Sequence, residues 1–148
     1  MAITCYKEYQ KKERIRGLDK RCREQLADSL ARIKTSIVDR ISQTKVEDVK
    51  PIQPDLIIAR LDQLENKIRY ASYGYSGAFD IVKIDISTLD RLYEFDRSLS
   101  SRIEQIKQLV AKTDKLTNSE LSAAFREISS AIKALDEHFD ERRRLYER

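Results

Sequence analysis

The amino-acid sequence predicts an all-α protein, an antiparallel four-helix bundle with a basic N-terminal helical extension. Three observations lead to this prediction. Apolar residues recur every three or four positions in four separate segments, which is the spacing of one buried helix face. The chain holds only three Gly and two Pro among its 148 residues, and these are the residues that turns between strands need. A length of 148 residues suits a single helical-bundle domain over residues 1–148.

The first long helix is predicted from Leu18, where the apolar spacing becomes regular. Its apolar face consists of Leu18, Cys22, Leu26, Leu30, Ile33, Ile37 and Ile41. Residues 1–16 before it are charged, with thin apolar spacing, and the sequence leaves open whether they are ordered without a partner. Residues 44–53 interrupt the pattern, and we expect an inter-helix connection there because residues before Pro51 and Pro54 disfavour the helical conformation.

The second helix is predicted to begin at Pro54, a residue that suits the first helical turn, with Asp55 near the positive end of the helix dipole. Its buried face consists of Ile57, Leu61, Leu64 and Ile68. Residues 70–86 contain two of the three glycines and are predicted to form a second connection. The β-branched run over residues 81–86 is compatible with a short strand or with the start of the next helix.

The third helix is predicted from about Ser87. Its apolar face consists of Leu89, Leu92, Phe95 or Asp96, Leu99, Ile103, Ile106 and Val110. Asp96 falls on or beside this face, and we expect it at the edge of the helix seam. The fourth helix is predicted to begin at the capping box Thr117 to Glu120, in which each side chain bonds to the backbone N–H of the other residue.

Six apolar residues form the buried face of the fourth helix: Leu121, Phe125, Ile128, Ile132, Leu135 and Phe139. The pattern allows this helix to continue through Leu145. The basic cluster Arg142 to Arg144 is explained by the negative end of the helix dipole. Because the connections between the four helices are short, neighbouring helices are predicted to be antiparallel.

Residues that carry catalysis or bind cofactors are scarce. Cys5 and Cys22 are widely spaced and His138 is the only histidine, whereas a structural zinc site needs four such ligands. Free thiols in a reducing compartment are the expectation, and no apolar segment resembles a signal peptide or a membrane span. The sequence therefore predicts a cytoplasmic protein with no metal and no cofactor.

One segment superficially resembles a nucleophile elbow, Gly74 to Ala78 around Ser76. It lacks the second glycine, and the sequence before it predicts a helix instead of the required strand. The Glu-x-x-His pairs of di-iron bundles are absent from the sequence as well. We therefore expect a protein that is not an enzyme.

The formal charge is concentrated near the N-terminus. Residues 1–24 contain eight basic and four acidic side chains, and the other 124 residues contain 21 of each. The candidate polyanion-binding residues are Lys7, Lys11, Lys12, Arg14, Arg16, Lys20, Arg21 and Arg23. Such a strip suits nucleic-acid phosphates, although interleaved acids also fit a solvated helix face or an arm that docks on a protein.

Aromatic residues outside the apolar faces are the candidate interface: Tyr6, Tyr9, Tyr70, Tyr73, Tyr75 and Phe79. Tyrosine is common in protein interfaces because it combines a large apolar area with a polar tip. The sequence thus predicts a non-enzymatic interaction, assembly or accessory subunit with coiled-coil-like helices, which binds a protein partner or self-associates as a homo-oligomer. The alternative is a small basic nucleic-acid-binding subunit of a larger nucleoprotein complex.

Overall fold

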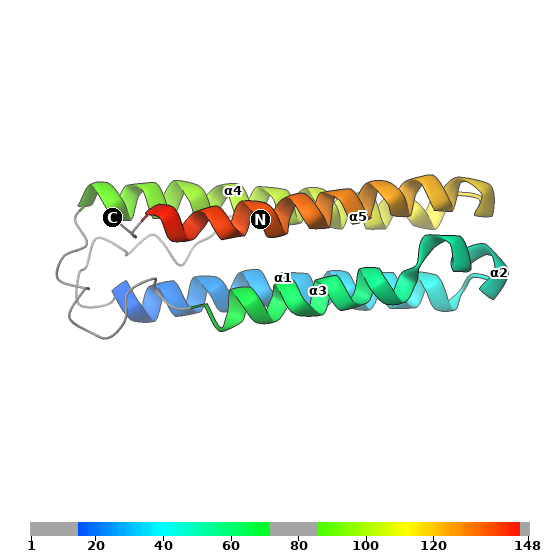
Figure 1. Ribbon diagram of the computed structural model, residues 1–148, viewed down its shortest axis with the longest axis horizontal. Coiled ribbons are helices and arrows are strands. Elements are labelled where there is room, and N and C mark those ends of the chain that lie inside the picture. The colour runs from blue at the N-terminus through cyan, green and yellow to red at the C-terminus, as the bar shows by residue number, and fades with distance from the viewer. Residues whose placement is uncertain (1–14, 72–85, 146–148) are drawn as a thin grey trace.

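The computed structural model describes residues 15–71 and 86–145. Four long helices dominate it (Figure 1): α1 (Ile15–Ser42), α3 (Pro54–Arg69), α4 (Ile86–Lys112) and α5 (Asn118–Glu141). Four short ones adjoin them: α2 (Val46–Val49), η3 (Lys50–Ile52), η5 (Thr113–Lys115) and η6 (Arg142–Leu145). The predicted all-α class with four main helices is confirmed. The predicted N-terminal extension falls largely on residues 1–14, outside the described residues.

The bundle consists of two helical hairpins in two layers. Figure 1 shows α1 and α3 in one layer and α4 and α5 in the other, with consecutive long helices running in opposite directions. Arg40, near the end of α1, donates a hydrogen bond to the carbonyl of Thr113, which directly follows α4. Lys67 of α3 pairs with Asp136 of α5, and both lie late in their helices. The hairpins therefore stack with α1 along α4 and α3 along α5, each pair in the same direction.

The core lies along the axis of the bundle and contains the apolar faces that the sequence predicts. Its buried members from the long helices are Leu26, Ala27, Leu30, Ile33, Ile37, Ile57, Leu61, Leu64, Ile68, Leu99, Ile103, Ile106, Val110, Leu121, Phe125, Ile128, Ile132, Leu135 and Phe139. Ile41 and Phe95 are partly buried against it. The side chains of Leu18, Leu89 and Leu92 are outside the described set.

The segment between α1 and α3 contributes to the core as well as linking the helices. Val49 and Ile52 of its two short helices are buried in the same cluster. Gln53 then takes a left-handed conformation with φ 56°, which reverses the chain before Pro54 starts α3. This is a conformation that costs a non-glycine residue some energy, so the core contacts of Ile52 and Ile57 on either side must hold it.

α5 begins where the sequence predicts, but the predicted capping box is not formed. Thr117 has the extended conformation of an N-cap residue, but its side chain makes no capping hydrogen bond to the backbone of the helix. Its hydroxyl lies 3.0 Å from the hydroxyl of Ser119. The amide of Glu120 donates to the backbone carbonyl of Thr117 at 3.0 Å. The prediction of reciprocal side-chain bonds is therefore wrong, because a neighbouring hydroxyl takes the place of the backbone N–H.

In the two described ranges, no helix has both the length and the apolar content that crossing a bilayer requires.

Candidate functional site

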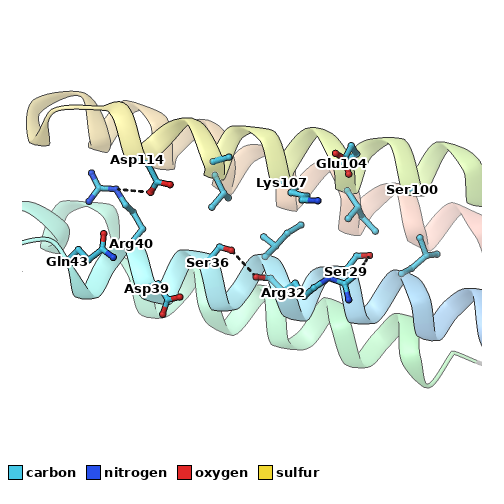
Figure 2. Close-up of a pocket in the computed structure, with 15 residues that line it drawn as sticks. Ser29, Arg32, Ser36, Asp39, Arg40, Gln43, Ser100, Glu104, Lys107 and Asp114 are labelled. Carbon is cyan, nitrogen blue, oxygen red and sulfur yellow. Dashed lines mark hydrogen bonds and ion pairs between the residues drawn. The ribbon is translucent and has the colours of Figure 1, made fainter. Parts of the chain in front are cut away.

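A groove runs along the face of the bundle where α1 lies beside α4. Its volume is about 510 Å³, within the range of about 300–1,000 Å³ that small-molecule pockets also span. Figure 2 shows its polar side chains along both helices, with Ser29 and Ser100 near one end and Gln43 and Asp114 near the other. The groove follows from the hairpin stacking, because that stacking sets α1 next to α4.

The α1 rim and the α4 rim are two rows of mostly polar side chains at heptad spacing. The α1 rim consists of Ser29, Arg32, Ser36, Asp39 and Gln43. The α4 rim consists of Ser100, Glu104, Lys107, Ala111 and Asp114, the last just beyond the helix. Steps of three and four residues keep each row on one side of its helix. Leu26, Ile33, Ile103 and Val110 line the groove between the rims. Polar rows of this spacing flank the seam along which two helices pack in a coiled coil, and the floor residues between them belong to the core and are at most 5% exposed.

Arg40 is the most fully engaged of the charged residues in the groove. Its Nε donates to the Thr113 carbonyl at 3.1 Å and lies 4.0 Å from the Asp114 carboxylate. Its Nη1 donates to the hydroxyl of Thr44 at 3.0 Å. These contacts tie the C-terminal end of α1 to the end of α4, so Arg40 is a structural contact at one end of the groove.

Four other charged residues of the groove make few polar contacts with described residues of the chain. Arg32 donates one hydrogen bond, to the hydroxyl of Ser29 at 3.1 Å, and both residues are on the α1 rim. Asp39, Glu104 and Lys107 make no side-chain hydrogen bond or ion pair with other described residues. The groove therefore presents charges of both signs that have capacity for an external partner.

A second polar cluster lies near the C-terminal end of α5. Arg142 Nε donates to Asp96 Oδ1 at 2.9 Å, and its Nη2 donates to Asp96 Oδ2 at 3.1 Å. The two side chains are only 2% and 1% exposed. Two expectations are corrected here. Asp96 is fully buried instead of at the seam edge, and Arg142 leaves the basic cluster at the helix end to neutralise it.

A serine, a histidine and a glutamate adjoin one another in the same region. Ser98 Oγ lies 2.8 Å from His138 Nε2, and His138 Nδ1 lies 3.5 Å from Glu141 Oε2. Nothing in the sequence pattern indicated this contact between residues 40 positions apart. The Ser98 hydroxyl also donates to the Phe95 carbonyl, at 2.6 Å, within its own helix. Ser98 also lies inside α4, where the backbone N–H groups are engaged in the helix instead of forming an oxyanion hole.

The surroundings of His138 favour its neutral form, and the stability of the protein should therefore depend on pH. Burial lowers the pKa of His138 from its usual 6.5, and the charge of Arg102 acts in the same direction, whereas Glu141 opposes both. The imidazole also stacks on Phe95, with ring centroids 4.4 Å apart. Below pH 6.5 the unfolded chain binds a proton at this residue more readily than the folded chain does. The stabilisation is thus complete above pH 6.5 and is lost as the pH falls through the lowered folded pKa.

We predict that the stability difference between the wild type and His138→Gln depends on pH in this direction. Urea unfolding at intervals from about pH 8 to about pH 5 measures it, since other titrating groups cancel in the difference. The advantage of the wild type over the variant should shrink as the pH drops below 6.5. A difference that stays constant over this range would contradict the lowered pKa.

The predicted polyanion-binding residues are only partly within the described residues. Lys7, Lys11, Lys12 and Arg14 lie outside them, and Arg16 is in α1 with its side chain undescribed. Lys20 and Arg21 are exposed on α1. Arg23 is a correction: it is 7% exposed, and its Nη1 donates to the carbonyls of Ile68 and Arg69 at 3.4 and 2.9 Å. It caps the C-terminal end of α3, so it does not belong to a solvent-facing strip.

The predicted interface residues are mostly outside the described residues too. Tyr6, Tyr9, Tyr73, Tyr75 and Phe79 fall there, and Tyr70, at the end of α3, is 76% exposed. The α1–α4 groove was not among the sites predicted from the sequence. The row of polar residues at heptad spacing from Ser29 to Gln43 was a usable signal for the groove. This row indicates a groove only when α4 is known to lie beside α1.

Cys22 corrects a further expectation. It is fully buried and disulfide-bonded, so it is not the free thiol that the sequence predicts. Cys5, the other cysteine of the sequence, lies outside the described residues. Free thiols therefore no longer support a reducing compartment, and the cytoplasmic location stays a prediction. Among the described residues, no three His, Cys, Asp or Glu side chains are grouped so that they could hold a metal ion.

The described part of the chain thus defines an all-α bundle of two stacked hairpins with a charged groove along one face. Comparison with protein-family models, with curated proteins and with solved structures found no match.

Proposed function

We propose that this chain is a non-enzymatic assembly or accessory subunit that acts through protein–protein contacts, and that the α1–α4 groove is its principal contact face. The observation that supports the proposal is the pair of heptad-spaced rims around an apolar floor. Helices of a partner pack against such seams, and the charges of Asp39, Glu104 and Lys107 are available to select that partner.

The mixed charge of the groove favours a protein over a nucleic acid. Three basic residues (Arg32, Arg40 and Lys107) and three acidic residues (Asp39, Glu104 and Asp114) line it. Phosphate backbones are bound by surfaces where basic residues predominate, and carboxylates along both rims would repel them. The nucleic-acid alternative rests on the N-terminal basic segment. Arg23 of this segment donates a hydrogen bond to the Arg69 carbonyl at the end of α3, so it is not available to bind phosphates.

Site-directed photo-crosslinking tests the proposal. The photo-reactive residue p-benzoylphenylalanine is placed at Ser36 on the α1 rim or at Lys107 on the α4 rim, and Arg126 on the exposed side of α5 is the control position. Irradiation in extract of the source cells, followed by mass spectrometry, should give a protein adduct from the two groove positions and not from the control position. The same yield at all three positions, or none at any of them, would refute the groove as the contact face.

A further inference from the structure

The charge of the α1–α4 groove is distributed unevenly along its length. Figure 2 shows Arg32, Glu104 and Lys107 toward one half, where two charges are basic and one is acidic. The other half, toward the C-terminal ends of both helices, holds Asp39, Arg40 and Asp114, with one basic charge and two acidic. The groove is therefore slightly positive in its first half and slightly negative in its second half.

This polarity is self-complementary under a two-fold rotation that reverses the helix direction. If a second copy faces the groove with its helices antiparallel, the positive half of each copy lies over the negative half of the other. A parallel arrangement would instead place like halves together. Two-fold isologous contacts, in which both copies use the same surface, are the commonest form of oligomer symmetry.

The α1 rim specifies the register of such a pair. Arg32 and Asp39 lie at equal distances on either side of a point between Thr35 and Ser36. If the two-fold axis passes through this point, Arg32 of each copy lies opposite Asp39 of the other, which gives two equivalent pairs. The small side chain of Ser36 then lies next to the two-fold axis. Arg32 and Asp39 are both exposed, so both are free of the core and able to reach a facing helix.

From this geometry we propose that a second copy of this chain occupies the α1–α4 groove, antiparallel, with reciprocal Arg32–Asp39 ion pairs on either side of a two-fold axis near Ser36. The inference rests on the proposed function and names the partner. Helices α1 and α4 of one copy then face the same two helices of the other copy, and the contact is formed mainly by the polar rims, because the floor residues Ile33 and Ile103 are already buried within each chain.

The size of the face sets the strength of the dimer. The α1 rim from Ser29 to Gln43 is about 21 Å long at about 1.5 Å per residue, and two helices side by side are about 20 Å wide. The contact is thus on the order of 400 Å² per copy, below the roughly 800 Å² per partner of a standard stable interface. The dimer should therefore be weak and depend on concentration and salt.

Charge reversal and mixing of two variants test the proposal on the purified full-length chain. In sedimentation equilibrium at low salt, the wild type should dimerise with rising concentration. Arg32→Glu and Asp39→Arg should each weaken the dimer about tenfold, because each replaces two attractive pairs by two repulsive ones.

An equimolar mixture of the two variants should recover the dimer. In the mixed pair, the introduced glutamate of one copy faces the introduced arginine of the other, and the two unchanged residues, Arg32 and Asp39, face each other across the axis. Arg126→Glu on α5 is the matched control and should dimerise as the wild type does.

Three outcomes would overturn the proposal. If the wild type stays monomeric at all concentrations, a second copy does not occupy the groove. If the groove positions nevertheless crosslink to another protein, the proposed function still holds, with that protein as the partner. A dimer that Arg32→Glu does not weaken forms through another face. Recovery when Arg32→Glu is mixed with Glu104→Arg, but not with Asp39→Arg, would establish a parallel pair instead. Unchanged circular dichroism of each exposed-site variant confirms that folding is intact.

Discussion

Asp96→Ala is expected to destabilise the protein by about 3–5 kcal/mol, because it leaves the guanidinium of Arg142 buried without its carboxylate. The two side chains are 1% and 2% exposed and share two hydrogen bonds, of 2.9 and 3.1 Å. Because only 2% of the Arg142 side chain is exposed, solvent compensates little for the lost partner. The pair also connects α4 to the turn after α5, so its loss should loosen this end of the bundle. Urea unfolding followed by circular dichroism measures the change.

Two variants distinguish the effect of an unpaired buried charge from an unspecific loss of stability. Asp96→Leu combined with Arg142→Met replaces the pair by apolar side chains and should restore most of the stability, since a buried ion pair is often dispensable when both partners are removed. Asp62→Ala removes the acid of the Lys34–Asp62 pair, whose side chains are 31% and 48% exposed. It should cost less than about 1 kcal/mol. If Asp96→Ala lowers the free energy of unfolding no more than Asp62→Ala does, the buried pair contributes no more to stability than the exposed pair.

The apolar faces were predictable because burial of a helix leaves a periodic trace in the sequence. Ile57, Leu61, Leu64 and Ile68 repeat at the helical period and are all 2% exposed or less. Pro54 marked the start of α3 through its fixed backbone angle and its missing N–H. Such signals are local, so they do not depend on which helix lies next to which.

The stacking of the hairpins was not predictable, because the stripes of α3 and α4 would pack equally well against several neighbours. Arg23, Asp96 and Arg142 were misplaced for the same reason. Each is buried beside a polar group that lies 45 or 46 residues away in the chain. Asp96 did carry a usable signal, since a charge among core positions needs a partner, but several basic residues competed for that role.

The groove depends both on the local sequence pattern of α1 and on the stacking of the two hairpins. The rim from Ser29 to Gln43 is readable as a polar heptad in the sequence, yet a polar row beside an apolar one is also what any solvated helix presents. Only the placement of α1 along α4, seen in the Arg40–Thr113 contact, sets Arg32 and Lys107 around one hollow. Function in this chain is therefore inferred from the joint surface of two hairpins and not from any motif.

The core that holds the two hairpins together yields the second large prediction. Phe125 is 1% exposed, lies in the N-terminal half of α5 and belongs to the continuous apolar cluster. Phe125→Ala removes a ring from a close-packed interior and leaves a cavity that the surrounding helices fill only in part. We expect a loss of about 3–5 kcal/mol, which for a chain of this size lowers the melting temperature by about 10 °C. Calorimetry and urea unfolding measure the two quantities.

Leu56→Ala is the matched control, because Leu56 on α3 is 46% exposed and its truncation should change stability by only about 0.5 kcal/mol. The midpoint of the Phe125→Ala transition should shift while its dependence on urea concentration stays the same, as for a cooperative domain in which both hairpins unfold together. If that dependence instead falls and two transitions separate, the hairpins unfold independently. The α1–α4 groove would then be a contact between two weakly joined halves, and partner binding there would be expected to stabilise the hairpin stacking itself.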